Sequence, residues 1–278
     1  MARNNLRIIY QNVVDASSTT FSASSTAGTT NVANLKKDTK SLVWRSNGKS
    51  SETITVTFTQ SIIGGIILPF CNLSSTAILT VQIYTGASLL KTYSTTACPY
   101  SGLGLWDWGV LPLGSNSYSY GGGAYGRIWF TEGQISCNKL VITINDSNNA
   151  SSYLELSRLV IGSYWSPLYN TEFGLSTSMK DLSEHTRTES GDLQTNRGIR
   201  YNTMNFDLKY LNAADRLSIT QIMRGSGIPK PLFISLFPND EDSNKEQSHQ
   251  IYGKLSQLGD ITHPIFSMYS TSVDIEEI

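Results

Sequence analysis

The chain has 278 residues, of which 21 are basic and 22 are acidic, so its net charge is −1. This length allows two ordinary domains or one large all-β domain. The longest basic cluster is Lys36–Lys37, which excludes a surface built to neutralise a nucleic-acid backbone. Only 15% of the residues are charged, whereas Ser, Thr, Asn, Gly and Tyr are abundant, a composition more typical of exposed β-sheet proteins than of intracellular enzymes.

The N-terminal sequence Met-Ala-Arg-Asn-Asn has no apolar segment behind its single charge, and the longest apolar run, residues 62–70, is interrupted by two glycines and a proline. We therefore expect neither a signal peptide nor a membrane span. Synthesis without a signal peptide implies a reducing compartment, and the three cysteines lack Cys-x-x-Cys spacing. We expect them to be buried free thiols: Cys71, Cys98 and Cys137.

Through residue 162, short alternating runs separated by turn residues predict an antiparallel β-sandwich. No amphipathic helix of useful length is expected in this half. The predicted strands are residues 6–10, which open the sandwich, 53–58, 79–83 and 140–144, which alternate, 62–70, which is buried on both faces, and 153–161, which closes the sandwich.

Residues 99–126 are rich in Gly, Tyr and Trp and predict a long loop, because ordering so many glycines inside a sheet is costly. Aromatic faces stack on sugar rings and a carboxylate accepts hydrogen bonds from hydroxyls, so this loop is the candidate ligand-binding segment. Two alternatives remain: the tryptophans close the core, or the tyrosines contact a neighbouring subunit. The candidate residues are Trp106, Asp107, Trp108, Tyr118, Tyr120 and Tyr125.

Beyond Gly162 the charge density rises and the first convincing helix is predicted. Asn212 is its N-cap and Arg224-Gly225 its C-terminus. The strands expected around it are residues 204–208, 232–237, 251–258 and 265–275. This half is therefore expected to be an α+β unit, with one helix on a small antiparallel sheet or barrel.

Residues 240–244 begin like a calcium loop, with oxygen-bearing side chains at alternate positions. Lys245 and Ile251, however, occupy the places of the required Gly and Glu, so we expect a solvated acidic hairpin. The histidines are far apart in the sequence and no pair has metal-ligand spacing. We expect no metal and no cofactor from them: His185, His249 and His263.

Catalytic patterns are also missing. The sequence contains no Gly-x-Ser-x-Gly nucleophile elbow, and every histidine lies outside the N-terminal half that carries the candidate loop. A glycosidase needs two carboxylates in one cleft, for which the loops offer only Asp107 and Glu132. The Gly225-Ser-Gly227 turn precedes a proline and not a helix, so it does not bind phosphate. We predict a protein that is not an enzyme.

Residues 6–162 resemble discoidin-like domains, the factor 5/8 type C family, which are galactose-binding-like jelly rolls. The resemblance rests on residues 23–27, 34–35 and 42–46, followed by the strand and the buried run described above. It implies that Trp44 is a core or base-packing residue, and it does not transfer a ligand. The disulfide that ties the ends of many extracellular members has no counterpart in this sequence.

Residues 166–278 resemble bacteriophage distal-tail and baseplate proteins in their order of strand, capped helix, glycine and proline-led strand. The pattern lies in residues 200–211, the helix, and residues 227–236. In that family a small β-barrel with one helix assembles into a ring, so the resemblance implies a ring-forming unit. Fold likeness alone does not establish function.

Together these observations predict a mainly β protein with a jelly-roll sandwich at residues 1–162 and an α+β assembly domain at 163–278. We expect a non-enzymatic subunit of a phage tail tip or baseplate, located in the virion. Its expected partners are other tail proteins, further copies of itself and host-surface glycan. The alternatives are a purely architectural docking protein and a soluble carbohydrate-binding module.

Overall fold

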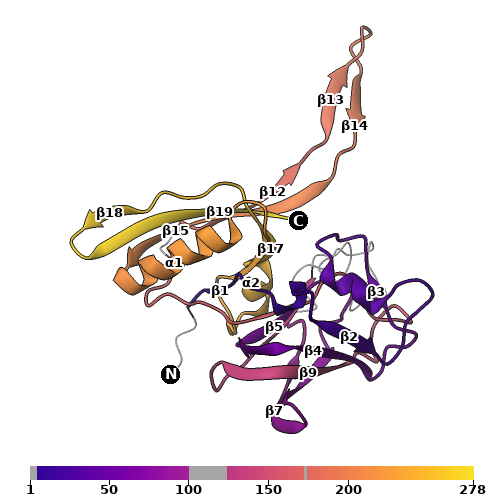
Figure 1. Cartoon of the computed structure of the whole chain (residues 1–278). Coiled ribbons are helices and arrows are strands. Elements are labelled where there is room, and N and C mark those ends of the chain that lie inside the picture. Colours follow the sequence, from indigo (N-terminus) through magenta and orange to yellow (C-terminus); the bar gives the residue numbers. More distant parts are fainter. Residues whose placement is uncertain (1–4, 100–123, 172–173) are drawn as a thin grey trace.

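The computed structural model describes residues 5–99, 124–171 and 174–278. It contains two sheets of a β-sandwich, a third sheet that packs on the sandwich, and a helix that covers the far side of the third sheet (Figure 1). Three apolar cores separate these four layers. The predicted mainly β class, a sandwich with an α+β part, is confirmed.

The outer sheet of the sandwich contains the alternating strands that the sequence predicts. Ile54, Val56 and Phe58 are buried in the core, as are the alternating apolar residues of the strands predicted at 79–83 and 140–144. All its pairs are antiparallel. The strand order is β2 (Thr20–Ala23), β4 (Glu52–Ile63), β9 (Ile135–Asn145), β6 (Ile78–Thr85) and β7 (Ser88–Thr96).

The inner sheet lies between two cores. Every residue of β5 (Gly65–Cys71) and β8 (Ala124–Trp129) is buried, which confirms the predicted burial on both faces for residues 65–70. The start of the run predicted at 62–70 differs, because Ile62 lies in β4 and is 59% exposed. The faces of a strand alternate, so a strand that packs on both sides needs apolar residues at almost every position. The remaining strands are β3 (Trp44–Arg45), β10 (Glu155–Leu156) and β11 (Val160–Gly162).

The strand predicted to open the sandwich lies elsewhere. Residues 7–9 form β1 (Arg7–Ile9), which pairs with β16 (Leu232–Ser235) of the third sheet. An alternating pattern indicates a strand but does not identify its partner, so this prediction was wrong in its placement. The chain enters the sandwich after β1 and returns at Trp165, whose backbone exchanges two hydrogen bonds of 2.9 Å with Ile8.

The third sheet is antiparallel throughout its described pairs and curves under the helix. One face packs on the helix and the other on the inner sheet of the sandwich. The predicted C-terminal strand is a hairpin with a turn at Phe266. The strands are β1, β16, β17 (Gln250–Leu255), β19 (Met268–Glu277), β15 (Arg200–Leu211) and β12 (Ser176–Asp181), with β18 (Thr262–Ile265) paired to β19.

Helix α1 (Ala213–Ser226) is the predicted helix, with the predicted N-cap. The side-chain oxygen of Asn212 accepts a 2.8 Å hydrogen bond from the backbone N–H of Asp215. Gly227, with a φ of 54°, ends the helix in the left-handed region that glycine adopts without strain. Ile219, Ile222 and other apolar residues bury one face of α1 against β15 and β19.

Two further features complete the fold. Helix α2 (Ser243–Ser248) precedes β17, and strands β13 (Glu184–Arg187) and β14 (Leu193–Asn196) form a hairpin that extends away from the molecule (Figure 1). The short 3-10 helices are η1 (Val13–Asp15) and η2 (Val32–Lys36). Among the described residues, no helix is long and apolar enough to cross a membrane.

The three cysteines are buried and free, as predicted. Cys71 and Cys98 face each other across the sandwich core with 3.6 Å between their sulfur atoms. Burial raises the pKa of the Cys137 thiol to about 11, which keeps it protonated and unreactive at neutral pH.

Candidate functional site

Most of the predicted ligand-binding residues lie outside the described residues, in the segment that connects β7 to β8. Their role therefore stays a prediction. They are Trp106, Asp107, Trp108, Tyr118 and Tyr120.

Tyr125, the sixth candidate, is not on an accessible surface. It is 2% exposed because the third sheet covers the outer face of β8. Its hydroxyl donates to Glu277 and accepts from the backbone N–H of Tyr252, both at 3.1 Å. Burial raises the pKa of Tyr125 well above its ordinary value. We therefore correct its assignment: Tyr125 joins the two parts of this chain and does not bind a ligand from solution.

A buried ion pair connects the same two parts. Arg127 on β8 donates two hydrogen bonds, of 2.8 and 2.6 Å, to the carboxylate of Glu246 on α2. Glu246 is completely buried and also accepts from the backbone N–H of Asn239 at 2.9 Å. This bidentate geometry, with the remaining lone pairs used, is what a buried ion pair requires.

Gln247, the next residue on α2, binds the backbone of Tyr125 as a neighbouring strand would. Its side-chain oxygen accepts from the N–H of Tyr125 at 3.2 Å, and its amide donates to the carbonyl of Tyr125 at 2.9 Å. Helix α2 thus supplies hydrogen-bond partners for the buried backbone of Tyr125 and a counter-charge for Arg127, both on β8.

Arg158 makes a second buried contact between the two parts, through the hydroxyl of Tyr252, and the sequence pattern concealed it. Its ion pairs lie within the sandwich. Residues 153–161 were predicted as one closing strand, but the arginine at their centre is 2% exposed and separates β10 from β11. Its guanidinium binds Asp38 at 2.9 Å and the hydroxyl of Tyr252 at 2.9 Å, and it also pairs with Asp15. The signal in the sequence that could have revealed this contact is a charged residue inside an apolar run.

The acidic segment at residues 240–244 is not a solvated hairpin, so this prediction was wrong. Asp242 caps α2 and accepts hydrogen bonds from the backbone of Asn244 at 3.0 Å and Lys245 at 3.2 Å. The side chain of Lys245 donates to Asp240 at 2.9 Å and lowers the pKa of that carboxyl group. No group of three or more His, Cys, Asp or Glu residues in the described part of the chain is arranged to hold a metal ion.

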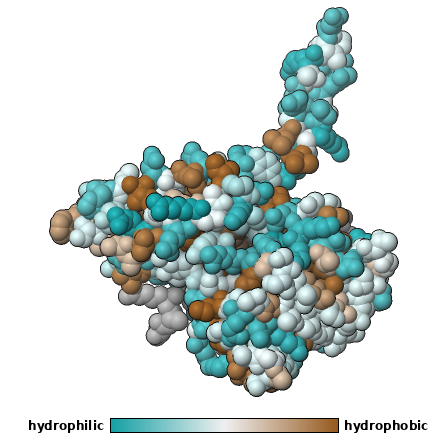
Figure 2. Space-filling view, in the orientation of Figure 1, coloured by the Kyte–Doolittle hydropathy of each residue, from teal (hydrophilic) through white to brown (hydrophobic). Residues whose placement is uncertain are grey.

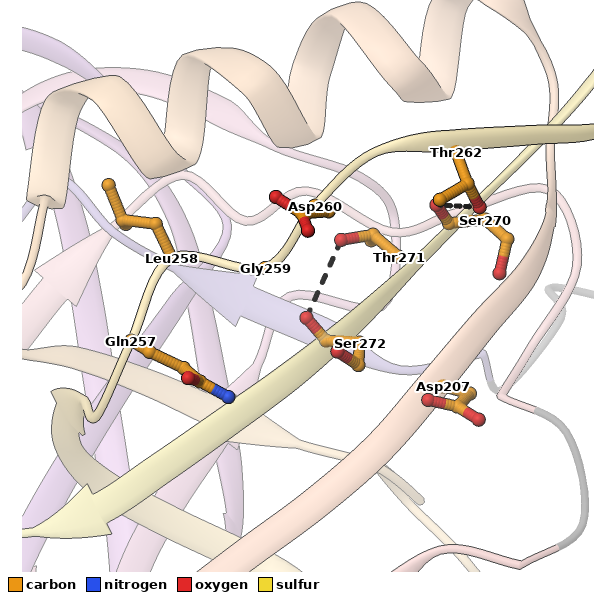
Figure 3. Close-up of a pocket in the computed structure, with 9 residues that line it drawn as sticks. All are labelled: Asp207, Gln257, Leu258, Gly259, Asp260, Thr262, Ser270, Thr271 and Ser272. Carbon is orange, nitrogen blue, oxygen red and sulfur yellow. Dashed lines mark hydrogen bonds between the residues drawn. The ribbon is translucent and has the colours of Figure 1, made fainter.

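A polar pocket of about 330 Å³ lies between β15, β19 and the segment before β18 (Figure 3). Its lining contains the carboxylates of Asp207 and Asp260, together with several hydroxyl groups, but no aromatic residue, histidine, cysteine or lysine. It therefore offers neither a stacking surface for a sugar ring nor a pair of nucleophile and base. We assign no reaction to it.

The hairpin that extends from the third sheet is the most exposed part of the described chain. We define the arm as residues 176–200, which comprise β12, β13, β14 and the segments that join them to β15. All residues of these three strands are exposed. Hydrophobic surface gathers at the root of the arm (Figure 2). Four large apolar side chains of the arm are more than half exposed: Met179, Leu182, Leu193 and Ile199.

No protein-family model matches this chain, and none of the curated proteins does. Solved structures that align with it include a family 32 carbohydrate-binding module of C. perfringens NanJ in complex with galactose, at 13% identity, covering 55% of this chain and 98% of that chain with a TM-score of 0.37.

The lectin domain of lectinolysin, in complex with Lewis B antigen, aligns at 13% identity over 56% of this chain and 99% of that chain, with a TM-score of 0.37. A chitosan-binding module from Paenibacillus sp. IK-5 aligns at 16% identity over 55% of this chain and 99% of that chain, with a TM-score of 0.38. At these identities and scores we transfer no residue role and no ligand.

Proposed function

We propose that this protein is a non-enzymatic subunit of a larger protein assembly, which binds neighbouring subunits through the arm and carries the β-sandwich as a binding domain. The observation that supports this most is the arm itself, which extends from the molecule without covering any other element (Figure 1). The contacts between the sandwich and the third sheet hold the two parts together as one body.

An isolated two-stranded hairpin is at best marginally stable in water. Strands β13 and β14 pair only with each other, and the described apolar side chains at the root of the arm contribute exposed surface instead of core. Exposed apolar groups concentrated on one projection are typical of protein interaction sites. A second subunit that covers the arm would bury these side chains and extend its hydrogen bonding.

The experiment is light scattering on the purified full chain at several concentrations. We expect a discrete oligomer, whose association weakens at least tenfold in the double variant Leu182→Ser/Ile199→Ser. The matched control is Leu217→Ser/Ile228→Ser, which removes two apolar side chains of comparable exposure elsewhere. A monomer at every concentration, or equal behaviour of the two variants, would contradict assembly through the arm.

We also propose that the sandwich binds carbohydrate, through the predicted segment around Trp106 and Trp108. The support is the two-sheet sandwich, whose β7 and β8 flank an aromatic-rich connection. The alternative is a soluble carbohydrate-binding module that acts without an assembly. Titration calorimetry with galactose, fucose and chitosan oligosaccharides, the kinds of ligand named for the similar structures, tests binding.

Trp106→Ala/Trp108→Ala should abolish any heat of binding, while Tyr169→Ala, which removes an exposed aromatic ring elsewhere, should leave it unchanged. Undiminished binding by the double variant would place the carbohydrate site elsewhere. No binding by the unmodified protein favours the purely architectural role, in which the sandwich docks other proteins.

The assembly we propose is a bacteriophage tail tip or baseplate. The support is the low-charge composition and the order of strand, capped helix and proline-led strand in residues 200–236, which the structure contains as β15, α1 and β16. In a phage that carries Trp106→Ala/Trp108→Ala, we expect intact particles with reduced adsorption to host cells. Unchanged adsorption of the variant phage would contradict the binding role and favour the purely architectural one.

A further inference from the structure

Three polar residues form one row across the third sheet, on the face that packs on the sandwich. Arg7 of β1 lies opposite Ser235 of β16, and Ser235 lies opposite Gln250 of β17. Residues opposite each other in an antiparallel sheet point to the same face. The next residues along this face, Ile9 and Phe233 among them, belong to the core shared with the sandwich.

All three side chains are buried. Arg7 is 7% exposed, Ser235 is 0% and Gln250 is 5%. The guanidinium of Arg7 lies 4.9 Å from the ring centre of Trp129 on β8 and 4.6 Å from that of Tyr164, so two aromatic rings fix its position. The row is therefore closed from solvent, and Trp129 of the sandwich covers it at Arg7.

This row contains most of the unpaired buried polar atoms of the described chain. Seven buried side-chain nitrogen or oxygen atoms have no hydrogen-bond partner there; four of them belong to the three residues of the row, and a fifth belongs to Trp129 beside Arg7. Native proteins satisfy nearly all buried polar atoms, so five in one place indicate a missing partner. The five atoms are Arg7 Nη1, Ser235 Oγ, Gln250 Nε2, Gln250 Oε1 and Trp129 Nε1.

The charges point to the kind of partner. Arg7 makes no ion pair with a described carboxylate, and Glu246, which acts on it electrostatically, binds Arg127 with both oxygens. Two arginines therefore share one glutamate in a buried place, which leaves one positive charge without a counter-charge. Burying a charge without a counter-charge is strongly unfavourable, because the charge loses its hydration and gains no attraction in return.

We propose that Arg7, Ser235, Gln250 and Trp129 bind one small monovalent anion, of the chloride or formate class, between the third sheet and the sandwich. Four of the five unpaired atoms are hydrogen-bond donors, which matches an anion. Water would satisfy the donors but would leave the charge of Arg7 without a counter-charge. The anion joins β1, β16 and β17 to β8 and so stabilises the contact between the two parts of the chain.

Thermal unfolding of the full chain tests this, in gluconate buffer titrated with sodium chloride or sodium formate at constant ionic strength. We expect Tm to rise by about 5 °C when the free anion reaches about 100 times its Kd. Separate titrations with chloride and with formate show which of the two ions binds more tightly. The rise should disappear in Arg7→Met and persist in Arg224→Met, which removes an exposed arginine from α1.

Ser235→Ala and Gln250→Leu keep the charge of Arg7 and serve if Arg7→Met does not fold; each should weaken the anion dependence at least threefold. A crystal soaked in bromide should show an anomalous peak beside Arg7. A Tm that does not depend on the anion, or the same dependence in every variant, would overturn the proposal, as would a site occupied by water alone.

Discussion

Glu246 carries its charge where water does not reach it, and its two oxygens together accept three hydrogen bonds. Glu246→Gln keeps the shape but leaves Arg127 as a buried charge without its partner. We expect the free energy of unfolding to fall by about 3–5 kcal/mol, the range for breaking a buried ion pair. Denaturant unfolding of both proteins measures the difference.

The control for this prediction is Glu155→Gln, which breaks the more exposed ion pair with Arg45. Exposed pairs contribute about 0–1 kcal/mol, so this variant should unfold almost like the unmodified protein. Equal losses in the two variants would show that the Glu246 pair does not hold the two parts of the chain together.

Two buried tyrosines between the sandwich and the third sheet, Tyr125 and Tyr252, make the stability of the protein depend on pH. Burial raises the pKa of Tyr125 and of Tyr252 above the ordinary tyrosine value. The unfolded chain therefore loses these protons first as pH rises, and the folded chain retains them. Their contribution is complete below about pH 10, the ordinary value, and is lost progressively above it.

Denaturant unfolding between pH 8 and pH 11 measures this loss. In Tyr252→Phe the decline above about pH 10 should be shallower, because one of the titrating groups is gone. The matched substitution Tyr169→Phe, at an exposed position, should leave the decline unchanged. An identical decline in all three proteins would contradict the role of Tyr252.

Some residue environments were predictable from the family resemblance of residues 6–162. Trp44 was expected as a core or base-packing residue, and it is fully buried with its indole N–H bound to the carbonyl of Ser25 at 3.1 Å. Tyr125 was not predictable, because its burial depends on the third sheet, whose strands β16 and β17 lie more than 100 residues further along the chain. No local pattern contains such information.

At the scale of single helices and strands, the N-cap of α1 makes a measurable contribution to stability. The side chain of Asn212 satisfies one of the backbone N–H groups that a helix leaves free at its start. Asn212→Ala should lower the free energy of unfolding by about 1 kcal/mol. Asn148→Ala, whose exposed side chain binds only Thr76, should cost less, and equal costs in denaturant unfolding would contradict the capping role.

Strands with a buried face were visible in the sequence, whereas the arm was not. All residues of its three strands are exposed, so no buried face imposes the alternation of apolar and polar side chains that indicates a strand. Helix α2 was missed for a different reason, because it is short and the side chains that it buries, Glu246 and Gln247, are polar. Elements that bury little apolar surface of their own leave no hydrophobic pattern.

On the scale of the whole molecule, the double burial of β5 and β8 predicts that the sandwich is not independent. A chain ending at Gly162 would lose the third sheet and expose the outer apolar face of the inner sheet. We expect this fragment to aggregate or to unfold at a much lower temperature than the full chain. That face includes Ile67, Phe70, Tyr125, Trp129 and Val160.

Calorimetry of the full chain should correspondingly show one unfolding transition for both parts, because the contact between them contains an apolar core as well as ion pairs. Two separate transitions, or a soluble fragment with the stability of the full chain, would contradict this. Gel filtration and circular dichroism of the fragment complete the comparison.

The chain crosses between the sandwich and the third sheet twice, on entry after β1 and on return at Trp165. The two crossings run in opposite directions and are hydrogen-bonded to each other through Ile8 and Trp165. They also pack closely at Gly162, where any side chain would collide with the backbone carbonyl of Gln11. A mechanical pull on the sandwich is therefore shared by two covalent connections. It also acts against β1, which is anchored between β16 and Trp165 and must be sheared out before the two parts can separate.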